Sequence, residues 1–152
     1  MTAEPTARRA FLWALFANFI WINASEIARY FFVIRPMLRQ LLAGQEGVAP
    51  MSWSIFGLWG IWDAILIVAA TGFYWLWLDK FGKGWPQIVM ASAAFTVTLF
   101  GLLWLGVANM GLAPYSLLLA ALPLAWLEQA GACWIVFQVR AKSYSPSSMR
   151  SI

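Results

Sequence analysis

The chain has 152 residues, of which 62% are hydrophobic and 11% are charged, and its formal net charge is +4. A soluble domain of this size carries about 25% charged residues, so this composition excludes a water-soluble fold and indicates an integral membrane protein. Histidine is absent and cysteine occurs once, at Cys133, which excludes histidine-ligated haem or zinc, cysteine metal clusters and an intramolecular disulfide. We therefore expect no metal and no cofactor, and the basic residues form no stripe of the kind that binds nucleic acid.

The first apolar segment runs from residue 10 to about residue 34 and follows a short N-terminus, residues 1–9, that ends in two arginines. Pro36 disfavours helical geometry at the residue before it, so we expect this span to end there. A helical continuation over residues 37–43 is expected to lie along the membrane surface, and residues 44–50 to form a loop.

Three further apolar segments follow in the same chain, over about residues 53–78, 86–110 and 114–138. Pro86 stands in the first turn of the third segment, where its missing N–H group costs nothing. The polar tail, residues 141–152, is expected to be disordered. Residues 10–140 thus form one transmembrane domain.

Each segment is slightly longer than the roughly 20 residues that an α-helix needs to cross a hydrocarbon core. The segments lack the alternating polarity of transmembrane β-strands. The sequence therefore predicts an all-α membrane protein, an up-down bundle of four transmembrane helices.

The distribution of basic residues predicts the orientation of the bundle. The side that holds both termini carries seven basic residues, Arg8, Arg9, Lys80, Lys83, Arg140, Lys142 and Arg150. The opposite side carries two, Arg35 and Arg39. Because positive loops stay in the cytoplasm, we expect both termini to face inward. The size and the lack of a recognisable targeting segment favour a bacterial inner membrane, although a signal peptide cleaved near Ala24 is the alternative for the first segment.

Four ionisable residues lie inside the predicted spans: Glu26, Arg29, Asp63 and Glu128. A charge at mid-helix costs about 2.5–3.5 kcal/mol on insertion scales, so such residues are expected to face other helices and are candidates for a functional site. On a helical projection, Asn18, Ser25, Glu26 and Arg29 form one stripe about 100° wide, with Asn23 on its flank. Glu26 and Arg29, at i and i+3, are spaced to form an ion pair.

The depth of these residues can be counted from the outer ends of the spans at about 1.5 Å per residue. This places Arg29 about 7 Å, Glu26 about 12 Å and Asp63 about 15 Å from the outer end, with Asn109 near the same boundary. Glu128 falls about 21 Å deep, nearer the cytoplasmic half. We expect the seven residues Asn18, Asn23, Glu26, Arg29, Asp63, Asn109 and Glu128 to contribute to a ligand-binding site in the outer half of the bundle.

The residues singled out inside the spans could also have purely structural roles. The Glu26–Arg29 pair and the acids Asp63 and Glu128 could serve only to fix how the helices pack. Gly60 and Ala64 form a small-xxx-small pair that favours close helix packing. The deeper tryptophans could line a pocket or simply pack in the core; these are Trp21, Trp59, Trp62, Trp104 and Trp126.

Three functions are compatible with this pattern. The first is a small oligomeric membrane protein that binds or transports a small ligand or ion, with Glu26 and Asp63 as exchangeable carboxylates. The second is a non-catalytic accessory or assembly subunit that contacts lipid or another membrane protein, whereas the first would be a homo-oligomer. The third is an intramembrane enzyme that modifies a lipid, which the absence of histidine and of a reactive cysteine pair makes the weakest of the three.

Overall fold

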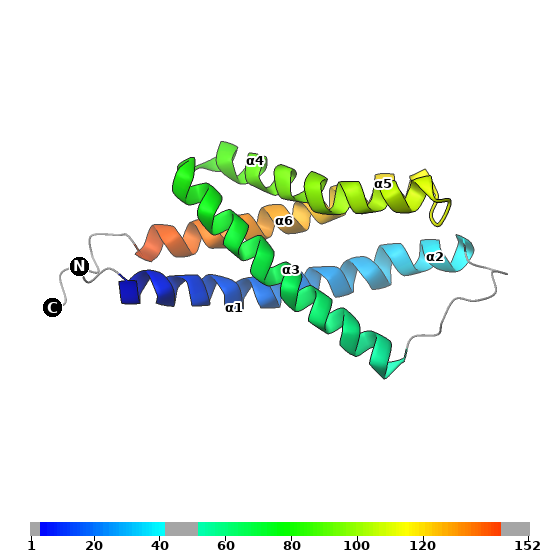
Figure 1. Cartoon of the computed structure of the whole chain (residues 1–152), viewed down its shortest axis with the longest axis horizontal. Helices are drawn as coiled ribbons and strands as arrows, with labels where there is room; N and C mark the ends of the chain where they lie inside the picture. The colour runs from blue at the N-terminus through cyan, green and yellow to red at the C-terminus, as the bar shows by residue number, and fades with distance from the viewer. Residues whose placement is uncertain (1–3, 42–51, 144–152) are drawn as a thin grey trace.

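The computed structural model describes residues 4–41 and 52–143, and the regular structure in these two stretches is helical. Figure 1 shows that both described ends of the chain lie at one end of the molecule, which we call the terminal end; the opposite end is the far end. Within the described residues, four helical stretches are long and apolar enough to cross a membrane: Ala7–Met37, Trp53–Lys80, Trp85–Asn109 and Tyr115–Ser143. The predicted four-helix architecture is confirmed, and it is that of a multi-pass membrane protein. The predicted loop over residues 44–50 lies outside the described residues, as does the tail from residue 144 onward.

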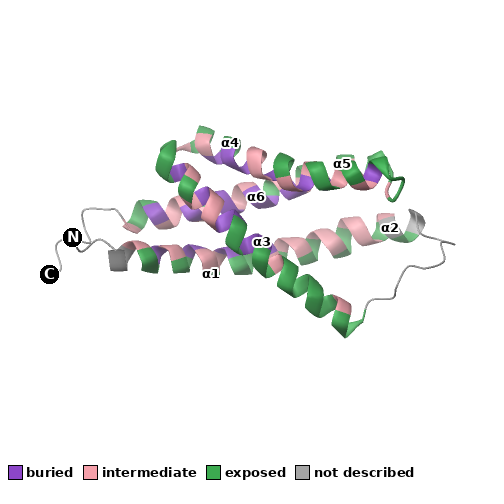
Figure 2. Cartoon of the chain, viewed as in Figure 1, coloured by how far each residue is buried: buried purple, intermediate pink, exposed green. Residues whose placement is uncertain are grey.

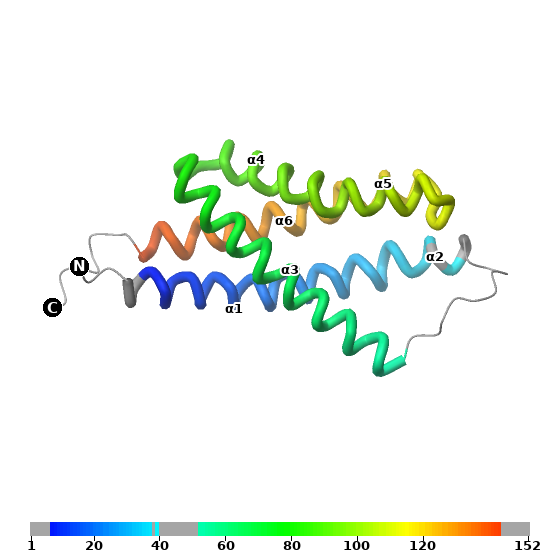
Figure 3. The backbone as a smooth tube through the Cα atoms, viewed as in Figure 1, coloured from blue at the N-terminus to red at the C-terminus, as the bar shows by residue number. Residues whose placement is uncertain are grey.

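We expected from the sequence that the first span ends at Pro36, but the helix continues beyond this residue. Helix α1 (Glu4–Arg29) passes through a π-helical segment, η1 (Tyr30–Ile34), into α2 (Arg35–Leu41), and Figure 3 shows one continuous path. In a regular α-helix the ring of Pro36 would meet the carbonyl group of Phe32. Here the Arg35 N–H group donates to the Tyr30 carbonyl, five residues back. This wider turn carries the helix past the proline.

Helix α3 (Trp53–Lys80) crosses the other helices diagonally (Figure 1). Its second half packs in the core, whereas its first half, which we call the α3 arm (residues 53–65), is largely exposed (Figure 2). A Cβ atom added at Gly60 would meet no heavy atom within 4 Å. The close packing expected at the Gly60–Ala64 pair is therefore not made within the described chain.

The third span consists of α4 (Trp85–Thr96), a second π-helical segment, η2 (Val97–Gly101), and α5 (Leu102–Asn109). A turn at Gly111, whose φ of 73° suits a residue without a side chain, leads into α6. Helix α6 (Tyr115–Ser143) continues through Pro123 and runs beyond its predicted end. The first residues of the predicted tail are therefore helical.

The core lies towards the terminal end, where α1, α3, α4 and α6 meet. Fully buried alanines let these helices approach closely: Ala14, Ala70, Ala91 and Ala132. Tyr74 and Ile88 fill the space between the helices. A smaller buried cluster, built on Leu66, Phe100 and Ala125, borders this core at Phe95, which packs against both. The close packing at the terminal end contrasts with the exposed α3 arm.

Arg140 joins α6 to the C-terminal turns of α3 at the terminal end. Its side chain is buried, and its Nη1 group donates to the Trp75 carbonyl at 2.5 Å. Its Nη2 group forms an ion pair with Asp79, and its guanidinium lies 4.8 Å from the centre of the Trp75 ring. We refer to these contacts as the Arg140 clamp.

Candidate functional site

Four charged side chains from three helices come together inside the bundle: Glu26 and Arg29 from α1, Asp63 from α3 and Glu128 from α6. Arg29 lies between the acids, with its Nη2 atom 2.9 Å from Glu26 Oε1 and 3.8 Å from Glu128 Oε2. The carboxyl group of Asp63 lies near that of Glu26. We call these four residues the charge cluster.

Glu128 is held by neutral donors as well as by Arg29. Its side chain is 2% exposed, and its Oε2 atom accepts a hydrogen bond from the Ser25 hydroxyl at 2.9 Å. Its Oε1 atom accepts from the Gln129 amide at 3.2 Å, and the oxygen of that amide accepts from the Tyr74 hydroxyl at 2.8 Å. These donors fix the orientation of a carboxylate that is removed from water.

Asp63 lies at the root of the α3 arm, on the Glu26 side of the charge cluster. Its Oδ1 atom is buried and has no hydrogen-bond partner among the described residues. Two adjacent carboxylates repel each other, so the Arg29 guanidinium bonded to Glu26 is the counter-charge on this side of the cluster.

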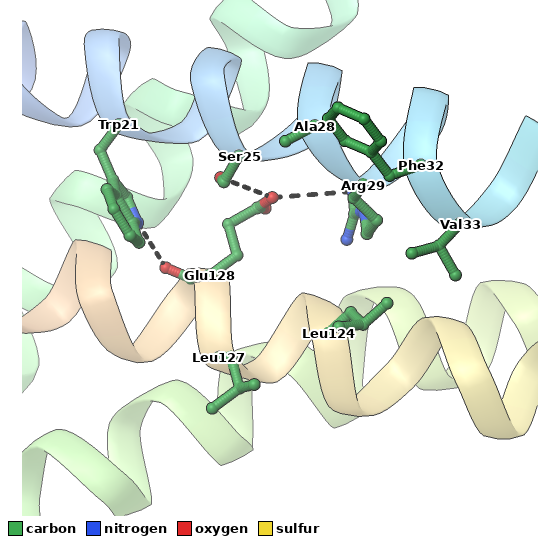
Figure 4. Close-up of a pocket in the computed structure, with 9 residues that line it drawn as sticks. All are labelled: Trp21, Ser25, Ala28, Arg29, Phe32, Val33, Leu124, Leu127 and Glu128. Carbon is green, nitrogen blue, oxygen red and sulfur yellow. Dashed lines mark hydrogen bonds and ion pairs between the residues drawn. The ribbon is translucent and has the colours of Figure 1, made fainter.

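On the other side of Arg29, a groove of about 410 Å³ lies between α6 and the helix formed by α1 and η1 (Figure 4). Its lining is formed by Trp21, Ser25, Ala28, Arg29, Phe32, Val33, Leu124, Leu127 and Glu128. Ser25, Arg29 and Glu128 place their polar groups in the middle of the groove, with apolar side chains at both ends (Figure 4). The size falls within the roughly 300–1,000 Å³ of small-molecule sites.

Trp21 closes the end of the groove nearer the terminal end. Its indole N–H group donates to the main-chain carbonyl of Glu128 at 2.8 Å. The ring lies against Gly131, where an added Cβ atom would be only 2.6 Å from the indole. Glycine at this position therefore makes the recess in α6 that the indole occupies.

The two π-helical segments lie beside the charge cluster. Segment η1 begins immediately after Arg29, and η2 contributes Phe100, whose ring centre is 6.0 Å from the Arg29 guanidinium carbon. Segments of this kind are frequent at functional sites, because they change the direction of side chains without ending the helix. Their position supports a functional interpretation of the cluster.

The three predicted asparagines do not join the cluster. Asn18 is buried two turns before Glu26 and donates to the Thr71 hydroxyl at 3.0 Å. Asn23 donates to the Phe19 carbonyl of its own helix at 2.8 Å. Asn109 is exposed at the end of α5 and does not line the groove.

The count along the chain placed Glu128 about 9 Å farther than Glu26 from the outer ends of the spans, and this relative depth is wrong. Glu128 lies at the level of Ser25 and Arg29. The count along the chain assumed that the spans end at the same height, whereas α2 extends beyond the predicted end of the first span.

Sequence reasoning missed the groove residues that are not charged. Ser25 was on the predicted polar stripe but was not assigned to the site, and Trp21 was one of several deep tryptophans. Gly131 and Phe100 gave no signal, because their roles depend on neighbours that are about a hundred residues and about seventy residues away in sequence. Only the three-dimensional packing identifies them.

Comparison with known protein families, curated proteins and solved structures finds no match to this chain. Within residues 4–41 and 52–143, no three Asp, Glu or Cys side chains are arranged to hold a metal ion. The groove and the charge cluster are therefore the features of the molecule that point to a function.

Proposed function

We propose that this membrane protein binds an amphipathic organic cation in the groove between α1 and α6. The observation that carries this proposal is the buried carboxylate of Glu128, which lines the groove beside Ser25 and Arg29, with apolar side chains around these three residues. A buried carboxylate favours a cationic partner, since a charge in an apolar environment is costly unless it is paired, and Glu128 shares the Arg29 guanidinium with Glu26. The apolar lining suits a ligand with a hydrophobic body.

The balance of charge around the groove favours a cation over an anion. The charge cluster contains three carboxyl groups and one guanidinium, and that guanidinium already contacts both Glu26 and Glu128. An anion would have to compete with these carboxylates for Arg29. A cation instead gains a carboxylate partner, and the rings of Trp21 and Phe32 offer aromatic faces for cation–π contacts.

The exposed rim of the groove suggests the route by which the ligand enters. Phe32 and Leu127, which line the groove, are 83% and 58% exposed. In a membrane these side chains face the lipid, so an amphipathic ligand can enter sideways from the bilayer. The α3 arm would be the surface for the alternative role as an accessory subunit, but lipid covers an apolar helix equally well. The groove therefore carries the proposal.

The test compares two ions of the same size and opposite charge, tetraphenylphosphonium and tetraphenylborate. We expect the purified protein in lipid nanodiscs to bind the phosphonium, measured by equilibrium dialysis, with empty nanodiscs subtracted. Glu128→Gln should weaken this binding at least about tenfold, because a charged partner in a desolvated site is worth roughly 2–5 kcal/mol.

Asp79→Asn is the matched control, because it removes a carboxylate that is 67% exposed and lies outside the groove. This variant should bind like the unmodified protein. Equal or tighter binding of tetraphenylborate would contradict the proposal, as would full binding by Glu128→Gln.

We also propose that both termini face the cytoplasm of a bacterial cell, which would put the far end of the groove towards the outer leaflet. The support is the bias of seven basic residues against two. A C-terminal alkaline phosphatase fusion should be inactive in bacteria, whereas the same enzyme fused in the segment of residues 42–51 should be active. The reverse pattern would overturn this orientation.

A further inference from the structure

Building on the proposed function, we infer that Trp21, seated against Gly131, is the residue that selects the bound cation by size. Figure 4 shows the indole at one end of the groove, with the Ser25, Arg29 and Glu128 side chains next to it and Phe32 and Val33 at the other end. From residue 21 to residue 33 the groove follows α1 for about 18 Å. Trp21 therefore limits how far a ligand can extend towards the terminal end.

The indole is held in place by two independent constraints. The hydrogen bond from its N–H group to the Glu128 carbonyl fixes the ring edge at 2.8 Å. The recess at Gly131 receives the ring itself, because a Cβ atom there would be 2.6–2.8 Å from three atoms of the indole. A ring fixed in this way is a rigid wall and not a side chain that moves aside for a larger ligand.

The wall is attached to the residue that supplies the charge. Trp21 bonds the main chain of Glu128, and the carboxylate of the same residue lines the groove. A cation placed against this carboxylate therefore meets the indole as well. The distance between the positive centre and the ring is set by the position of Trp21, which in turn depends on Gly131.

Two substitutions should change the size of the groove in opposite directions. Trp21→Ala removes the wall and lengthens the groove. Gly131→Ala fills the recess, so the indole must leave it and move into the groove. In an apolar site, a mismatch of about one methylene changes affinity by roughly 10–200-fold.

The experiment measures binding of tetramethyl-, tetraphenyl- and tetra-p-tolylphosphonium to each variant in nanodiscs. For Trp21→Ala we expect the ratio of tolyl to phenyl affinity to rise about tenfold or more. Binding of tetraphenylphosphonium itself should weaken roughly three- to thirtyfold, because a cation–π contact is lost. For Gly131→Ala we expect affinity for the two large ions to fall relative to the tetramethyl ion.

Matched controls keep these results interpretable. Trp134→Ala removes a tryptophan of α6 with similar exposure, 43% against 40% for Trp21, that does not line the groove. Gly106→Ala adds a Cβ atom in open space. Both controls should keep the original order of affinities. If Trp21→Ala does not fold, Trp21→Phe takes its place, because it keeps a smaller ring without the indole N–H group. This variant should also raise the ratio of tolyl to phenyl affinity, but by a smaller factor.

The outcomes separate this inference from the proposed function. If the unmodified protein binds tetraphenylphosphonium and both groove variants keep its order of affinities, Trp21 does not select by size and only this inference fails. If the unmodified protein binds none of the three cations, the proposed function fails and this inference fails with it.

Discussion

Replacing Arg29 by glutamine is expected to lower the free energy of unfolding by about 3–5 kcal/mol, the cost of breaking a buried ion pair from one side. The guanidinium is the cation that Glu26 and Glu128 share, and its side chain is only 17% exposed. Without it, three carboxyl groups remain together inside the bundle. The loss can be measured by reversible unfolding in mixed detergent micelles, followed by far-ultraviolet circular dichroism.

A double variant tests whether this loss comes from unpaired charge and not from lost packing. Glu128→Gln combined with Arg29→Gln removes one acid together with the guanidinium and should recover part of the stability. Arg9→Gln, an exposed change on the same helix, should be nearly neutral. If Arg29→Gln has the same free energy of unfolding as the unmodified protein, the guanidinium is not the counter-charge of the cluster.

Arg140→Met is expected to lower the free energy of unfolding by about 2–3 kcal/mol. This is the range for a hydrogen bond made by a charged group together with its ion pair. The variant keeps an apolar side chain of similar length but loses the donor to the Trp75 carbonyl and the partner of Asp79. The effect should be smaller than that of Arg29→Gln, because Asp79 is 67% exposed and stays hydrated when its partner is removed. The same unfolding assay measures it.

The position of the Arg140 clamp also predicts which helical turns are destabilised in Arg140→Met. Amide hydrogen exchange should speed up in the C-terminal turns of α3 and α6, with the charge cluster unchanged. Lys142→Met, an exposed change two residues later, should leave the exchange rates as they are. Equal destabilisation by both variants would mean that the clamp contacts add nothing beyond surface charge.

The sequence predicted the fold well because membrane helices are defined by local properties. The spans over residues 53–78 and 86–110 differ by only a few residues from Trp53–Lys80 and Trp85–Asn109. The prediction that the first span ends at Pro36 was wrong for a physical reason. The rule that proline ends a helix assumes regular α-helical hydrogen bonds, and the π-helical segment η1 replaces them.

The candidate site was predictable only in part. The cost of placing charges in lipid identified Glu26, Arg29, Asp63 and Glu128 as residues that must face other helices, and the structure brings these four together. The side chains of Asn18 and Asn23 carry no charge, and each donates outside the cluster, to the Thr71 hydroxyl and to a carbonyl of the same helix. The groove itself depends on how α1 and α6 pack, which no local pattern encodes.

The exposed rim formed by Phe32 and Leu127 has a consequence for how affinity must be expressed. A ligand that reaches the groove through the lipid is present there at a concentration set by its partition coefficient and by the volume of the bilayer. Adding protein-free vesicles should then dilute the ligand in the membrane and reduce occupancy when the total amount of ligand in the sample is held constant. The natural unit for this site is the mole fraction of ligand in the membrane.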